Sequence, residues 1–128
     1  MSDKIAPRPT DRELAILNVL WQHGPATVRQ VHELLPGAGA TQYTTTLKQL
    51  QVMTERRLVD RDDSQKSHVF SAAIEEGGAK RTLVAGVIDQ VFGGSVRKMV
   101  LHALEARDIT DEEVDEIKRL LVKRGTQK

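Results

Sequence analysis

Hydrophobic residues recur every three or four positions along most of the chain, which is the spacing of amphipathic helices. Three of the helix starts carry a capping box, in which a threonine precedes a glutamate or glutamine by three residues. These pairs are Thr10 with Glu13, Thr27 with Gln30, and Thr110 with Glu113. The pattern predicts helices at about residues 10–23, 27–35, 41–57, 76–92, 96–104 and 110–121.

Two short segments depart from helical spacing. Residues 58–61 and 68–71 flank a turn-rich linker at residues 62–66, and this arrangement predicts a β-hairpin. The hairpin follows a pair of short helices joined by a glycine-containing turn at residues 36–39. A helix-turn-helix followed by a hairpin is the winged-helix arrangement. We therefore predict a mostly α fold whose N-terminal domain, residues 7–73, is a winged helix-turn-helix with a small hairpin wing.

The helix at residues 41–57 has an unusual polar side. Tyr43, Leu47, Leu50 and Met53 form its apolar stripe, while threonines, glutamines and one lysine occupy the other side. A solvated helix surface usually mixes glutamate with lysine, whereas hydroxyl, amide and ammonium groups suit phosphates and base edges. We interpret this helix as a recognition helix. The alternative is a polar surface helix that contacts nothing.

The candidate DNA contacts come from this helix and from the hairpin. In a winged helix the hairpin tip lies beside the DNA groove, where cations and hydroxyls reach phosphate. Asp62 and Asp63 would oppose such a contact, so we expect them to point away from DNA or to cap the turn. The predicted DNA-binding residues are Gln42, Thr44, Thr45, Lys48, Gln51, Arg61 and Lys66.

The last third of the chain carries apolar faces that a small isolated unit cannot cover. The three helices together contain about fifty residues, and an isolated unit of that size is too small to form a comfortably stable core. We expect a second copy of the chain to cover them, which makes residues 74–124 a helical dimerisation domain. The alternative is that these helices fold back on the N-terminal core. The predicted interface residues are Val84, Val87, Val91, Phe92, Val100, Leu104, Ile117, Leu120 and Leu121.

Composition narrows the function classes. The 128 residues include no cysteine, which excludes disulfides, thiolate metal sites and cysteine nucleophiles. The four histidines are scattered without metal-ligand spacing, and no acid, base and nucleophile set stands out. We therefore expect no metal, no cofactor and no enzymatic activity. The sequence has no membrane-spanning run and no signal-peptide core, so we expect a soluble, cytoplasmic protein.

Net charge gives DNA binding little support. The chain carries +1 at pH 7, with nine Lys/Arg against eight Asp/Glu in residues 1–71 and ten of each in residues 72–128. Bulk attraction to DNA is therefore weak, and recognition depends on where the charges lie. A winged helix that binds another protein, without DNA, stays an alternative on this ground.

A series of short motifs occurs in order along the chain. They are Pro9-Thr10, Glu13-Leu14, Val19-Leu20-Trp21, residues 24–29, Val31-His32-Glu33, Tyr43-Thr44-Thr45, Met53-Thr54-Glu55, Leu58-Val59 and residues 91–95. Over roughly residues 7–123 the chain resembles the penicillinase repressor family, the BlaI/MecI type of transcriptional repressor. The resemblance implies a dimeric winged-helix repressor of a promoter. It also implies that Thr44, Thr45 and Lys48 contact DNA and that Arg61 belongs to the wing.

The chain departs from the family pattern at three places. Several relatives carry apolar residues where this chain has Thr46 and Gln49, so we expect looser or rotated packing of the recognition helix. Arg57 stands where a glycine is common, and it lacks the easy left-handed cap that glycine provides. The better-known members are inactivated by a protease that cuts an Asn-Phe pair, and His102 and Ala103 occupy the matching positions. A regulatory protease is thus an implied partner, but cleavage with the same specificity is in question.

The sequence favours a sequence-specific DNA-binding transcriptional regulator, a repressor that binds an inverted-repeat promoter operator as a homodimer. Two recognition helices related by a two-fold axis would lie about 34 Å apart, one turn of DNA, or a multiple of that spacing. The expected partners are double-stranded DNA with a palindromic operator and a second copy of the chain.

Overall fold

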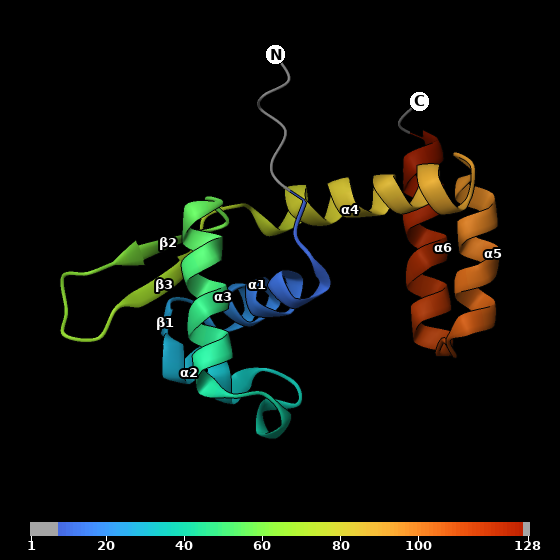
Figure 1. Ribbon diagram of the computed structural model, residues 1–128. Coiled ribbons are helices and arrows are strands. Elements are labelled where there is room, and N and C mark those ends of the chain that lie inside the picture. The colour runs from blue at the N-terminus through green and yellow to red at the C-terminus, as the bar shows by residue number, and fades with distance from the viewer. Residues whose placement is uncertain (1–7, 127–128) are drawn as a thin grey trace, which may run out of the picture. The chain divides into compact units, whose positions relative to one another are not determined.

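A computed structural model describes residues 8–126 (Figure 1). The chain divides into two compact units after Leu83. The elements of the first unit are α1 (Asp11–His23), β1 (Ala26–Thr27), α2 (Val28–Leu34), the 3₁₀ helix η2 (Ala38–Ala40), α3 (Tyr43–Glu55), β2 (Val59–Asp62) and β3 (Val69–Ala72). Helix α4 (Glu76–Val91) runs from the first unit into the second, which also contains α5 (Val96–Ala106) and α6 (Asp111–Thr126). The predicted mostly α fold with a small hairpin wing is confirmed.

The three predicted capping boxes all form. At α1, Glu13 N–H donates to Thr10 Oγ1 (3.2 Å), and Thr10 N–H donates back to Glu13 Oε1 (2.9 Å). The same reciprocal pair of bonds joins Thr27 with Gln30 at α2, and Thr110 with Glu113 at α6. These bonds satisfy amides at the helix start that have no partner within the helix.

The sheet is antiparallel, with strand order β1-β3-β2. Strands β2 and β3 form the predicted hairpin, although each begins and ends one residue later than predicted. Strand β1 was not predicted, because two residues are too few to show an alternating pattern and they overlap the cap of α2. Its pairing with β3, through Ala26 with Phe70 and Thr27 with Val69, brings the wing beside the start of α2.

One hydrophobic core holds the first unit together. Its most deeply buried side chains come from α1, α2, α3 and the hairpin, and they include Ile16, Leu17, Val31, Leu50, Met53, Leu58, Val59 and Phe70. Trp21 Nε1 donates to Ile74 O (3.1 Å), and Ala79 at the start of α4 is buried. Because α4 begins as part of this core, the compact units divide inside α4 rather than at the expected boundary between residues 73 and 74.

The second unit has no such core of its own. No residue described after Ala79 is buried. Gly93 and Gly94 end α4 as predicted, both at positive φ (59° and 85°), and Gly94 N–H donates to Ile88 O (2.8 Å). None of the helices in residues 8–126 combines the length and apolar character needed to cross a bilayer.

Candidate nucleic-acid interface

Helix α3 packs one side into the core of the first unit. Thr46, Leu50 and Met53 are 2%, 0% and 0% exposed, and they recur at the i, i+4, i+7 spacing of a buried helix stripe. Leu47 is partly buried against the same core, as predicted. The prediction that Tyr43 faces inward is wrong, since this side chain is 39% exposed. The reason is that the buried side is centred on Thr46, which leaves Tyr43 at its flank.

The opposite side of α3 is polar and open to solvent. Thr44, Lys48 and Gln51 are exposed, and Thr45 lies half-buried at the edge of this side. Gln42, the N-cap residue, is exposed and makes no side-chain capping bond, so its amide is not used by the helix. These five residues, which we call the recognition face, lie between the N-cap and the third turn of α3, on one side of the helix as predicted from the sequence.

The buried threonine has a polar partner. Thr46 Oγ1 lies 2.8 Å from His32 Nδ1 on α2, and the His32 ring also meets the Tyr43 ring edge-on, with the centroids 5.8 Å apart. This bond satisfies the one polar atom that the Thr46 side chain brings into the core. Of the looser or rotated packing expected from Thr46 and Gln49, the rotation is found, because the buried side of α3 is turned toward Thr46 and away from Tyr43.

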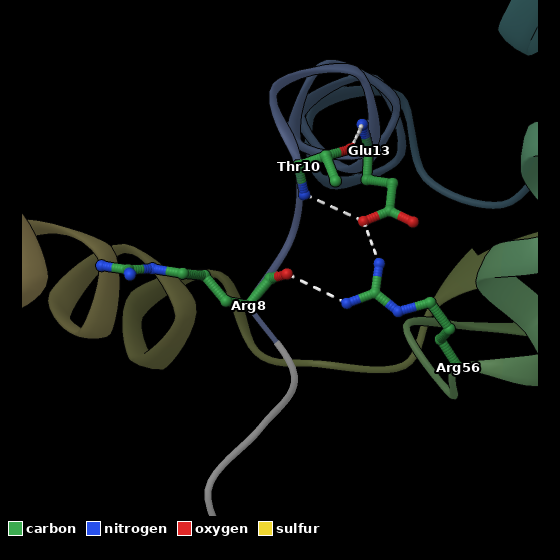
Figure 2. Close-up of polar contacts among 4 residues, drawn as sticks. All are labelled: Arg8, Thr10, Glu13 and Arg56. Carbon is green, nitrogen blue, oxygen red and sulfur yellow. Dashed lines mark hydrogen bonds and ion pairs between the residues drawn. The ribbon is translucent and has the colours of Figure 1, made fainter.

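A buried ion pair fixes the far end of α3. Glu13 on α1 is 2% exposed, and its carboxylate accepts hydrogen bonds from Arg56 Nη1 and from Thr10 N–H (Figure 2). Arg56 Nη2 also donates to Arg8 O (3.0 Å). Burial acts to raise the pKa of Glu13, but the bonds from Arg56 and Thr10 outweigh it and lower that pKa below its ordinary value of 4.5. Glu13 is thus ionised at neutral pH and ties the start of α1 to the end of α3.

Arg57 turns the chain from α3 toward the wing. It is the non-glycine residue with positive φ (64°) among residues 8–126, and Leu58 N–H donates back to Met53 O (2.9 Å). This is the return bond of a helix that ends in the left-handed conformation, the place glycine usually takes. The chain therefore forms the same cap with arginine, at a strain of about 1 kcal/mol.

The wing uses its acidic residues internally. Arg61 Nε donates to Asp63 Oδ1 (2.8 Å), and His68 Nε2 lies 3.6 Å from the same oxygen. Asp62 caps the turn as predicted, since it accepts from Ser64 N–H (2.9 Å), and this bond holds the pKa of Asp62 below its ordinary value. Arg61 is thus partly neutralised by Asp63, whereas Lys66 has no hydrogen-bond or ion-pair partner in the described part of the chain.

A groove between α2, α3 and the wing adds residues that were not predicted from the sequence. The Arg29 guanidinium lies 5.4 Å from the centroid of the Tyr43 ring, and Lys66 and His68 line the same groove from the wing. Arg29 is an exposed cation near the start of α2, far in sequence from the wing. The pairing of β1 with β3 is what brings them together, and no sequence pattern revealed that pairing.

An exposed polar helix face, the helices that hold it and a hairpin that carries cations define a winged-helix DNA-binding regulator. The chain belongs to the penicillinase repressor family, which matches residues 9–123. It is a DNA-binding transcriptional repressor and not an enzyme.

Several relatives are similar to this chain along most of their length. The penicillinase repressor of Bacillus licheniformis is 21% identical over 125 residues, covering 98% of each chain. The methicillin resistance regulatory protein MecI of Staphylococcus aureus (strain N315) is 20% identical over 112 residues, covering 88% of this chain and 91% of MecI. The transcriptional regulator BlaI of Mycobacterium tuberculosis (strain H37Rv) is 29% identical over 117 residues, covering 87% and 80%. Among solved structures, a MarR family transcriptional regulator from Silicibacter pomeroyi DSS aligns with a TM-score of 0.45 and 20% identity, covering 95% of this chain and 69% of that one.

Proposed function

We propose that this repressor binds an inverted-repeat promoter operator as a homodimer, with α3 in the major groove and the wing beside it. The observation that carries the proposal is the two-sidedness of α3. Leu50 and Met53 are fully buried, while Thr44, Lys48 and Gln51 directly opposite are exposed. A helix held this firmly can present hydroxyl, amide and ammonium groups to DNA with little loss of conformational entropy on binding.

The residues of the interface divide into two roles. Lys48 and Lys66 provide cations for phosphate, and Arg29 at the start of α2 can do the same. Gln42, Thr44, Thr45 and Gln51 provide the hydrogen-bonding groups that distinguish base edges. Arg61 is paired with the Asp63 carboxylate. It contributes to DNA binding only if its guanidinium leaves that carboxylate for a phosphate, or bonds to both at once.

Exposed apolar side chains of the second unit support the homodimer. Val91, Leu120 and Leu121 are 67%, 64% and 66% exposed. The other predicted interface residues from Val84 to Ile117 are also open or only half-buried in the single chain. Apolar surface of this extent on three neighbouring helices usually marks an interface. A second copy of the chain would cover it and would place two recognition faces on one DNA duplex.

A regulatory protease is the releasing partner that the family resemblance implies. The matching positions, His102 and Ala103, lie inside α5, where His102 stacks on Phe92 (centroids 5.7 Å apart) and its Nδ1 lies 3.2 Å from Glu105 Oε1. Proteases cut exposed, unstructured backbone more readily than a helix. We infer that any such protease has a specificity other than Asn-Phe and requires local unwinding of α5. Because a repressor must reach the DNA that it regulates, we place the protein in the cytoplasm.

Gel-shift titration against the DNA upstream of the protein's own coding region tests the proposal. Arg29, Lys48 and Lys66 give about six phosphate contacts per dimer, so affinity should fall about a thousandfold between 50 and 200 mM salt. A shuffled DNA of the same length and composition is the control and should bind much more weakly. The absence of a shift at micromolar protein, at the lower salt concentration, would instead favour a winged helix that binds another protein.

A further inference from the structure

A cavity of about 170 Å³ lies between α1, the end of α2 and α3, and of the proposed DNA contacts only Thr45 lines it. For scale, a cavity of about 150 Å³ in a protein core can hold one benzene ring. Among its lining residues, Ala15, Ile16 and Leu35 supply an apolar wall from α1 and α2. The cavity is therefore large enough for one small ring and apolar enough on one side to bind it.

The other side of the cavity carries hydrogen-bond donors, and none of its lining residues within 8–126 is an acid. Arg12 lines the cavity, its side chain is exposed, and it has no hydrogen bond or ion pair with any residue between 8 and 126. Thr41 and Thr45 add hydroxyls, and the 98%-buried Thr46 lies at the same cavity with its hydroxyl on His32. With a cation and no carboxylate among the described lining residues, the site favours a ligand that carries a negative charge.

We propose that this cavity binds a small organic carboxylate whose apolar body is no larger than one six-membered ring. The body would lie against Ala15, Ile16 and Leu35, and the carboxylate would accept hydrogen bonds from the Arg12 guanidinium and the neighbouring threonine hydroxyls. Arginine suits this role because its planar group can donate two parallel bonds to a carboxylate.

Such a ligand would be coupled to DNA binding, a step that rests on the proposed function. Thr45 and Gln49 line the cavity, and they also line a shallow depression on the outer side of α3 together with Thr44 and Lys48. A bound anion would restrain Thr45 and would add a negative charge beside the phosphates of a docked operator. The two ligands therefore oppose one another, and by linkage each weakens the other by the same factor.

Amide NMR titration of the full-length protein with benzoate, without DNA, tests the site itself. We expect saturable shifts at Ala15, Thr45 and their neighbours, with a Kd of about 1 mM or tighter. Benzamide, which has the same shape and no charge, should bind about tenfold more weakly. R12A should weaken benzoate about tenfold and leave benzamide nearly unchanged, whereas R29A, which removes a guanidinium outside the cavity, should bind benzoate like the parent.

Ala15→Leu fills the apolar wall and should abolish the binding of both compounds. If that variant does not fold, the comparison of R12A with R29A still tests the site. Both side chains are exposed, so both variants should fold. Equal binding of benzoate and benzamide, unchanged benzoate binding by R12A, or no saturable shift up to about 10 mM would overturn the proposal. These results do not depend on operator binding, so they remain interpretable if the proposed function fails.

Discussion

Thr46 and Arg57 show how single residues of unexpected type are accommodated around α3. A threonine at the centre of a buried helix stripe would leave a hydroxyl without a partner, but His32 Nδ1 lies 2.8 Å away and bonds to it. An arginine at positive φ is strained, yet it still allows the return bond from Leu58 N–H to Met53 O. Both positions could be noticed in the sequence as departures from the family pattern. How each residue is accommodated could not be predicted, because it depends on partners from other segments and on backbone geometry.

Replacing Arg57 by glycine should stabilise the protein. Glycine removes the left-handed strain, and although it raises the entropy of the unfolded chain, a net gain of up to about 0.5 kcal/mol should remain. Chemical denaturation followed by circular dichroism measures the gain. Arg57→Ala is the matched control, since it removes the same side chain and keeps the strain. A glycine variant no more stable than the alanine variant would contradict the account of this turn.

Substitutions on the recognition face should separate affinity from specificity. Lys48→Ala removes a phosphate contact, so binding should weaken by about 1 kcal/mol on every DNA sequence and the salt dependence should become shallower. Thr44→Ala or Thr45→Ala should instead relax discrimination at particular base pairs. Lys118→Ala, at an exposed position of α6, is the control for loss of a lysine. If affinity and base preference were unchanged in all three variants, α3 would not be the groove-facing helix.

The elements of the first unit are joined by bonds that define where α3 lies. His32 ties α2 to the middle of α3, and the buried Glu13 ties α1 to Arg56 at its end. The capping boxes, the hairpin and the inward Leu50 and Met53 were predicted from local spacing. The bond from Glu13 to Arg56 was not predicted, because its partners are separated by 43 positions along the chain and no periodic pattern connects them.

The same limit explains the rest of the interface. Thr44, Thr45, Lys48 and Gln51 were predicted because one helical period is enough to place them on one side. The contribution of Arg29 depends on the pairing of β1 with β3, which is a long-range contact between very short segments. The inward orientation predicted for Tyr43 was wrong. Leu50 and Met53 belong both to a stripe with Tyr43 and to a stripe with Thr46, and packing against the rest of the first unit buries the stripe with Thr46.

The ion pair between α1 and α3 should make stability depend on pH. The pKa of Glu13 is lower in the folded state than its ordinary value of 4.5. Ionised Glu13 therefore stabilises the fold above about pH 4.5, and this contribution is lost as pH falls through the lower folded-state pKa. Glu13→Gln keeps the capping bonds, as Gln30 does in α2, but should cost about 2 kcal/mol at pH 7 because it leaves Arg56 without its counter-charge.

Denaturation at several pH values measures this effect. The stability difference between the parent and Glu13→Gln should shrink as the pH is lowered from 6 toward 3. Glu33→Gln, at an exposed position of α2, is the matched control and should change little at any pH. A difference that stays constant over this range would show that the Glu13 charge does not stabilise the fold.

At the level of the whole molecule, the two units differ in their packing and in the surfaces that they expose. The first unit has a complete core and a recognition face, whereas the second has exposed apolar side chains and no buried residue from Val84 to Gly125. The chain carries a net charge of only +1 at pH 7, so this repressor cannot rely on bulk attraction to DNA. Doubling the recognition face through a dimer offers a route to specific affinity, since the second binding event becomes intramolecular.

Charges placed on the apolar face of the tail should yield monomers. Val91→Asp or Leu120→Asp would bury an unpaired carboxylate in the proposed dimer, so the dimer Kd should rise about a hundredfold or more. Sedimentation velocity measures the change, and circular dichroism checks that the helices persist. Gln90→Asp and Arg119→Asp, at neighbouring exposed polar positions, are the controls and should remain dimeric. A Val91→Asp protein that still sediments as a dimer would exclude the tail as the association surface.

Hydroxyl-radical footprinting on the upstream DNA tests most directly whether two recognition helices read one operator. The expected footprint has two protected half-sites related by two-fold symmetry, with centres about 34 Å apart or a multiple of that distance. Both half-sites should lose protection together in Val91→Asp. A single asymmetric footprint, or an unchanged footprint from the monomeric variant, would contradict the account.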